Sequence, residues 1–194
     1  IFSGFLIGTS YIPFPPWAIL FCYSPLLIFL TRDHVCPKKA FWGGWITQFI
    51  LSLIGFHWIA YTAHEYGSFP WSLSVITLLL FAALIHLYIP LAAVLIALLR
   101  KKFKFSEGTT LFVGALTLSL LERAWPSIFP WNMAYSLLWQ KLPAYQWADV
   151  IGFLGLSTLL FLLNALVAMS FTRPKQTKWP AVLAVILFVV LNIS

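Results

Sequence analysis

The charged residues of this chain are confined to short segments between long apolar runs, and this separation restricts the possible folds more than any other feature. Asp, Glu, Lys and Arg make up 9% of the residues, 61% are hydrophobic, and the mean hydropathy is +0.92. Soluble proteins carry about 25% charged residues. Because the backbone finds no water inside a bilayer, apolar runs of this kind must form helices there. The sequence therefore predicts an all-α integral membrane protein.

Seven apolar runs are candidates for membrane-spanning helices, and we expect them to form one bundle. They cover about residues 1–12, 17–30, 40–63, 72–99, 109–121, 150–171 and 179–192. The first is shorter than the roughly 20 residues that a span requires, so we expect the chain to begin inside its first helix. Pro90 should kink the fourth helix because proline removes a backbone hydrogen bond. No internal repeat or polar linker is visible, so we interpret residues 1–194 as a single membrane domain.

The basic residues are distributed unevenly among the connecting loops. Ten of the twelve lie in loops 31–39, 100–108 and 172–178, whereas Arg123 and Lys141 lie in the alternate loops. Short loops rich in Lys and Arg stay in the cytoplasm. The three basic loops are therefore predicted to be cytoplasmic, with the C-terminus on the opposite side. The net charge of +7 then reflects topology rather than nucleic-acid binding.

The segment 125–149 is rich in aromatic residues and leads directly into the sixth apolar run. Tryptophan and tyrosine favour the headgroup layer because their rings combine an apolar body with a hydrogen-bonding group. We therefore expect an interfacial aromatic loop between the fifth and sixth helices. In the helix that follows, Ser157, Asn164 and Ala168, together with Asp149 before it, fall within an arc of roughly 100°. This polar stripe should face protein rather than lipid.

The same stretch carries a family resemblance. Its distinguishing residues are the string Phe129-Pro130-Trp131-Asn132, the pair Tyr135-Ser136, and the series Gln146, Ala148, Asp149, Gly152, Gly155, Leu156, Ser157 and Asn164. This pattern resembles the corresponding segment of apolipoprotein N-acyltransferases, and a more general similarity extends upstream through residues 13–17, 43–44 and 55–59. Two departures are that Glu122 directly precedes Arg123, where the family separates the two, and that Ile128 replaces a glycine.

The resemblance implies a multi-pass protein of the bacterial inner membrane that takes part in lipoprotein maturation. Such enzymes carry an extracytoplasmic nitrilase-like domain after the seventh helix. Its Glu-Lys-Cys triad takes an acyl chain from a phospholipid as a thioester and passes it to the α-amino group of a diacylglyceryl cysteine. We expect that domain to lie outside this chain, which would hold the two lipid substrates.

Candidate substrate-binding residues lie at the predicted outer interface or along the polar stripe. They are Trp58, Glu65, Glu122, Arg123, Phe129, Pro130, Trp131, Asn132, Gln146, Asp149, Ser157 and Asn164. Phe129, Pro130 and Trp131 are predicted to form a rigid wall for acyl chains, since proline fixes the backbone between two large rings. For Glu122 and Arg123 two roles stay open: holding the loop by ion pairing, or meeting a phospholipid headgroup.

We expect no catalytic residue, cofactor or metal in this chain. Cys22 lies within an apolar run and Cys36 in a basic loop, without the lysine and carboxylate partners of the triad. His57, His64 and Glu65 include no short-spaced ligand pair, and His86 should face the bundle. The expected partners are phospholipid and lipoprotein substrates, without nucleic acid, and the expected state is a monomer. The alternatives are an inactive lipid-binding scaffold and a small transporter, although a transporter would be expected to show an inverted repeat.

The distribution of basic residues yields a direct test of topology. Reporter fusions after residue 104 and after residue 68 should report opposite sides of the membrane, with residue 104 in the cytoplasm. Two fusions that report the same side would exclude this arrangement.

Overall fold

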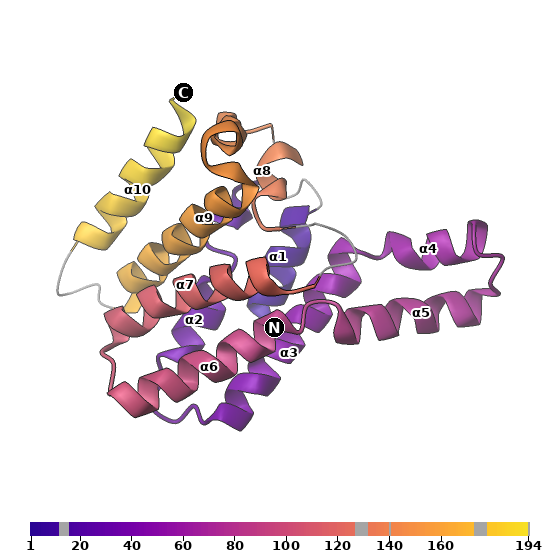
Figure 1. The fold of residues 1–194 in the computed structure, drawn as a ribbon, viewed down its shortest axis with the longest axis horizontal. Helices are drawn as coiled ribbons and strands as arrows, with labels where there is room; N and C mark the ends of the chain where they lie inside the picture. Colours follow the sequence, from indigo (N-terminus) through magenta and orange to yellow (C-terminus); the bar gives the residue numbers. More distant parts are fainter. Residues whose placement is uncertain (12–15, 127–131, 140, 173–177, 194) are drawn as a thin grey trace.

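The computed structural model describes residues 1–11, 16–126, 132–139, 141–172 and 178–193, and every regular element in these ranges is a helix (Figure 1). The longer helices are α1 (Phe2–Tyr11), α2 (Ser24–Leu30), α3 (Pro37–Gly55), α4 (Trp58–Glu65), α5 (Trp71–Leu84), α6 (Tyr88–Phe103), α7 (Glu107–Ala124), α9 (Ala148–Thr172) and α10 (Trp179–Asn192). The shorter elements are η1 (Pro16–Leu20), α8 (Tyr135–Trp139) and η2 (Pro143–Trp147). The predicted all-α class is therefore confirmed for the described residues.

Within the described residues, two helical stretches are long and apolar enough to cross a membrane, namely Trp71–Phe103 and Pro143–Thr172. Helices α3 and α4 form a third if they are counted as one span bent by 54°. Helix α10 is apolar but shorter. Each of the seven predicted runs overlaps one or two of the described helices, while the number of membrane crossings stays a prediction.

The bundle is built around α3, α6, α7 and α9. Helices α1 and α6 both pack against α3, α7 packs between α6 and α9, and α2 lies against α9. Helix α10 runs beside α9 at the edge of the molecule (Figure 1). Helices α3 and α6 approach closely at Gly44, where a Cβ atom would lie 2.6 Å from the Cα of Pro90. A small residue at this point lets the backbones of α3 and α6 meet.

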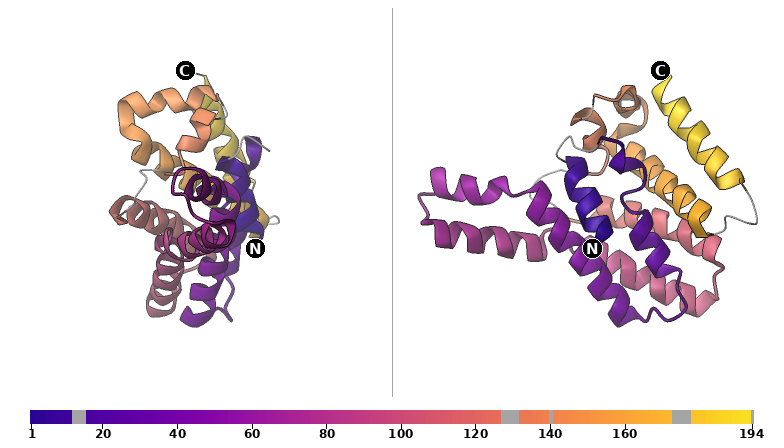
Figure 2. Two further views of the ribbon diagram at one scale, coloured as in Figure 1. Left: turned by 90° about the vertical axis from the view of Figure 1, so that its right-hand side faces the viewer. Right: turned by 180° about the vertical axis from the view of Figure 1, so that it is seen from behind.

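Helices α4 and α5 form a hairpin that projects from the bundle (Figure 2). The bend between α3 and α4 lies at residues 56–57 and turns α4 away from the bundle, so that α4 packs against α5. Along α5 the large apolar side chains are exposed; they include Leu73, Ile76, Leu79, Leu80 and Leu84. Lipid tails are as apolar as leucine, so such a surface is compatible with a bilayer.

The predicted interruption near Pro90 is present, at residues 85–87 between α5 and α6. Proline in the first turn of a helix has no N–H to donate, so the preceding turn loses a regular hydrogen bond. Side chains from other segments bind the carbonyl groups around the break. Gln48 donates to the Ala83 carbonyl at 2.7 Å, and Trp125 donates to the Ile85 carbonyl at 2.9 Å. The break is therefore held by α3 and by the end of α7.

The contact at Gly44 predicts a matched pair of stability effects. In Gly44→Ala the new methyl group would meet the backbone of Pro90, which cannot rotate away, and we expect a loss of about 2 kcal/mol in the free energy of unfolding. Gly108→Ala is the control because its Cβ would meet only the Met169 side-chain terminus at 3.4 Å. Denaturant titration in detergent measures both. Equal effects would show that the α3–α6 approach is not limiting.

Candidate functional site

A buried polar network connects the residues after position 131 to α7 and α9. The Met133 N–H donates to Oε1 of Glu122 at 2.9 Å, and the Ala134 N–H donates to Oγ of Ser157 at 3.0 Å. The Ser157 hydroxyl in turn donates to Oδ1 of Asn132 at 3.2 Å. Ser157 is fully buried and Asn132 is 9% exposed. The predicted site residues Glu122, Asn132 and Ser157 are thus brought together, and they fix the end of the interfacial loop.

Glu122 has a second carboxyl oxygen, Oε2, that is buried and accepts no hydrogen bond of ordinary length from the described residues. The hydroxyls of Ser157 and Tyr88 lie near this carboxyl group. The Tyr88 hydroxyl also lies 3.3 Å from that of Tyr23. An incompletely satisfied carboxyl group among apolar helices is costly, so it marks a candidate functional position.

Arg123 lies apart from this network although it follows Glu122 directly. Successive residues of a helix point about 100° apart, so the two side chains leave α7 in different directions. Arg123 is exposed and forms no ion pair with a described residue. The ion-pairing role considered for these two residues is therefore absent from the described part of the chain.

Asn164 is fully buried and its side chain is used entirely within the protein. Its Oδ1 accepts the Tyr23 N–H at 2.7 Å, and its Nδ2 donates to the carbonyls of Ile19 and Leu160, both at 2.9 Å. These bonds satisfy the backbone where η1 passes into α2. Asn164 therefore links α9 to the junction of η1 and α2, which favours a structural role.

The predicted polar stripe is confirmed in part. Ser157, Asn164 and Ala168 are all fully buried, as expected for a face that packs on protein. The inclusion of Asp149 in that stripe is wrong, because Asp149 is exposed. Gly152 has φ 71° and ψ 163°, a conformation that interrupts the helix and ends the 3.6-residue periodicity. Asp149 lies before this interruption and therefore does not share a face with Ser157.

The same interruption borders a lateral groove of about 660 Å³ between α7 and α9. Apolar side chains form most of its walls; they include Leu116, Leu120, Ile151, Phe153 and Leu154. The hydroxyls of Ser119 and Thr158 face each other at 2.6 Å across the two helices. Arg123 also lines the groove and is the charged group in its lining. An elongated apolar molecule with an anionic end matches this combination of walls and charge.

A second groove, of about 460 Å³, lies where the α4–α5 hairpin meets the bundle. It is lined by Thr77, Leu80, Phe81, Leu84, Ile85, Trp125 and Pro126. Pro126 lies three positions before Phe129, the first residue of the predicted aromatic wall. Phe129, Pro130 and Trp131 themselves lie outside the described residues, so the wall stays a prediction.

Comparison with known proteins identifies the family. The family described as "Apolipoprotein N-acyltransferase N-terminal domain" matches residues 3–166, most of the chain. The chain belongs to the apolipoprotein N-acyltransferase family. A relative named apolipoprotein N-acyltransferase from Bdellovibrio bacteriovorus is 59% identical over 165 residues, which are 85% of this chain and 30% of that protein. One of the same name from Geobacter metallireducens is 29% identical over 203 residues, 100% of this chain and 37% of that protein. The chain thus spans about a third of the length of these relatives.

The remaining candidate residues for apolipoprotein N-acyltransferase function lie in two other places. Trp58 is half-buried and packs against Phe56 at the start of the hairpin, whereas Glu65 is exposed at the end of α4. Gln146 is exposed on η2, close to Asp149 in the sequence. The structure therefore places Trp58 and Glu65 on the projecting hairpin rather than in the Glu122 network.

Several residues of the site were not identified from the sequence. Tyr23 and Tyr88 are 65 positions apart, and their hydroxyl contact depends on how α2 and α6 meet. Ser119 lies within an apolar run, and Thr158 directly follows Ser157, but neither position indicates that their hydroxyls meet. His86 is predicted from the sequence to face the bundle, and its Nδ1 lies 2.9 Å from the Ser52 hydroxyl. A polar residue in an apolar run indicates that its side chain faces protein. It does not indicate which other residue the side chain contacts.

The Ser157 network predicts a position-specific loss of stability. Ser157→Ala leaves the buried Ala134 N–H without its acceptor, so we expect a loss of about 1–3 kcal/mol in the free energy of unfolding. Ser170→Ala is the control on the same helix, because Ser170 donates only to the carbonyl of Leu166 in its own helix. It should cost about 0.5 kcal/mol or less. Similar losses from both changes would contradict an anchoring role for Ser157.

Proposed function

We propose that this chain is the membrane domain of an apolipoprotein N-acyltransferase, where it holds the phospholipid acyl donor and the diacylglyceryl-cysteine lipoprotein for N-acylation. Membership of the family supports the reaction class. The single observation that supports lipid holding by this chain is the lateral groove between α7 and α9, with Arg123 in its lining. The groove is open to the surface of the helical bundle, where a lipid would approach it.

The groove has the features that a phospholipid requires. Its apolar walls suit an acyl chain, whose burial removes apolar surface from less favourable surroundings. A guanidinium group can contact a phosphate diester with two parallel N–H groups, which fixes orientation as well as adding attraction. Glu122 and Ser157 hold the end of the adjoining loop from inside, at Asn132 and Met133.

The topology belongs to the same proposal. Seven spans in the bacterial inner membrane, with the three basic loops in the cytoplasm, place Arg123, the aromatic loop and the C-terminus toward the periplasm. Residues 1–194 then act as one membrane domain and as a monomer, and the groove is formed by two helices of a single chain. The catalytic triad belongs to the nitrilase-like domain of the family, so the role proposed for this chain is substrate holding.

An inactive lipid-binding scaffold is the second candidate, and the same groove supports it. Cys22 is buried in the bundle, and Cys36 is exposed at its basic end. The catalytic cysteine of the family belongs to the nitrilase-like domain, so neither of these cysteines is assigned that role. The two candidates differ in whether lipid binding is coupled to acyl transfer, and the experiments below separate them.

Photolabelling tests the groove directly. A phospholipid with a diazirine in its acyl chain should label peptides that contain residues 116–123 and 151–158 of the purified chain. Arg123→Gln should reduce this labelling roughly fivefold. The reason is that loss of one charge contact of about 1 kcal/mol weakens binding of the phospholipid by that factor. Lys141→Gln removes an exposed charge that does not line the groove and should leave labelling unchanged. Labelling spread evenly over α5, α9 and α10 would contradict a specific acyl-chain site.

The aromatic string is tested in a longer protein that carries the catalytic domain. Trp131→Ala should lower acyl transfer about tenfold or more while expression is unchanged, because loss of a desolvated ring costs several kcal/mol. Trp179→Ala is the control, since Trp179 is exposed at the start of α10. Small and equal effects would show that Trp131 only anchors the loop in the interface. Binding without any transfer in the unsubstituted protein would favour the scaffold.

A further inference from the structure

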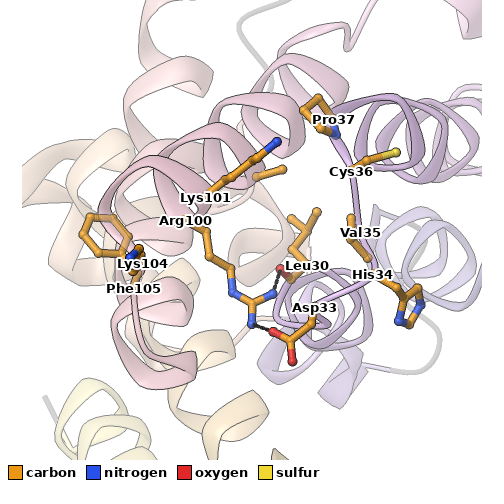
Figure 3. Close-up of a pocket in the computed structure, with 11 residues that line it drawn as sticks. Leu30, Asp33, His34, Val35, Cys36, Pro37, Arg100, Lys101, Lys104 and Phe105 are labelled. Atoms are coloured by element: carbon orange, nitrogen blue, oxygen red, sulfur yellow. Dashed lines mark hydrogen bonds and ion pairs between the residues drawn. The ribbon is translucent and has the colours of Figure 1, made fainter.

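A cavity of about 490 Å³ lies at the basic end of the bundle, between the loop after α2 and the end of α6 (Figure 3). One side is formed by Arg100, Lys101 and Lys104, and the other includes Asp33, Val35 and Cys36. Leu30, Ala97 and Phe105 add apolar surface. The lateral groove lies toward the other end of α7, which is about 27 Å long at 1.5 Å per residue. The cavity is therefore separate from the proposed acyl-donor site.

The charge in this cavity is only partly neutralised. Nη2 of Arg100 lies 2.7 Å from Oδ1 of Asp33, and Nη1 donates to the Leu30 carbonyl at 3.4 Å. These contacts hold the guanidinium group in place, with 16% of the Arg100 side chain exposed. Lys101 and Lys104 form no ion pair with a described residue. One carboxylate thus faces three cations, which leaves an excess of positive charge.

The start of α3, which borders the cavity at Cys36 and Pro37, is also favourable for negative charge. The N–H of Lys39 lowers the pKa of the Cys36 thiol, and the N–H of Lys38 and the charge of Lys39 act in the same direction. These amides belong to the first turn of α3, where backbone N–H groups have no partner within the helix. The side chains of α6 and Lys104 therefore supply the positive charge of the cavity, and the start of α3 adds to the positive potential at its border.

We propose that this cavity binds a phosphate group, and specifically that of an anionic phospholipid headgroup at the basic end of the bundle. Lysines supply point charges for phosphate oxygens, and Arg100 is already oriented by Asp33. Leu30, Val35, Ala97 and Phe105 provide apolar contacts for the glycerol and the first acyl carbons. Basic pockets between membrane helices have the chemistry that anionic headgroups require. A small soluble phosphate shares the charge but does not use the apolar surface.

Thermal unfolding of the purified chain in neutral detergent tests the site. Phosphatidylglycerol should raise the unfolding temperature in a saturable manner, because a ligand that binds only the folded state stabilises it. Phosphatidylcholine, which is zwitterionic, should have little effect. Glycerol 3-phosphate identifies the source: no effect at the same concentration assigns the site to lipid, whereas an equal effect assigns it to free phosphate. Stabilisation by phosphatidylcholine equal to that by phosphatidylglycerol would overturn the proposal.

Charge-matched variants localise the effect. Lys101→Gln with Lys104→Gln should weaken half-saturation by phosphatidylglycerol roughly 25-fold, because each lysine near an anionic group contributes roughly fivefold. Lys102→Gln with Lys178→Gln removes the same charge from exposed lysines outside the cavity and should change half-saturation less than about twofold. If the first double variant fails to fold, Lys101→Gln alone should still weaken binding roughly fivefold. Equal losses from the two double variants, or no loss from Lys101→Gln alone, would show only a general charge effect.

Discussion

The satisfaction of backbone hydrogen bonds in an apolar environment is the constraint on which this structure depends. Each interrupted helix exposes carbonyl or N–H groups that water cannot reach within the bilayer. Side chains from distant segments supply the missing partners. Asn164 binds the backbone at the junction of η1 and α2, while Gln48 and Trp125 bind the carbonyls at the break between α5 and α6. Polar residues that are unfavourable in a lipid-facing helix thus become the contacts that hold the bundle together.

The interruptions also create the surfaces on which function is proposed. Gly152 lies in the left-handed region of φ and redirects the start of α9, and the groove beside α7 is lined by residues on both sides of that point. A regular helix through this position would continue the 3.6-residue pattern and bring Asp149 onto the buried face. The bend after α3 similarly directs α4 and α5 away from the bundle, next to the groove at Trp125. Function is therefore proposed where helices break rather than where they run straight.

The two ends of the bundle differ in the number and the burial of their charged groups. Near the end of α7, one carboxyl group is buried among hydroxyls and one guanidinium group is exposed beside an apolar groove. At the end of α6, three cations and one carboxylate surround a cavity. This asymmetry agrees with the uneven distribution of basic residues along the sequence. Each end therefore offers different charged groups to the lipid headgroups proposed for it, although both lie on the same small set of helices.

The sequence by itself determined the all-helical class, the break near Pro90 and the buried face that carries Ser157 and Asn164, because these depend on local composition and on a 3.6-residue period. It also indicated the family, through Phe129 to Asn132 and the residues of α9. Only the tertiary structure decided that Asp149 is exposed, since the backbone conformation of Gly152 ends the period that the prediction assumed. It also decided that Asn164 binds residue 23, that Tyr88 meets Tyr23, and that Lys101 faces the start of α3 across a cavity. Such pairs join residues far apart in the chain, and their contacts arise from helix packing, which no local pattern in a single sequence encodes.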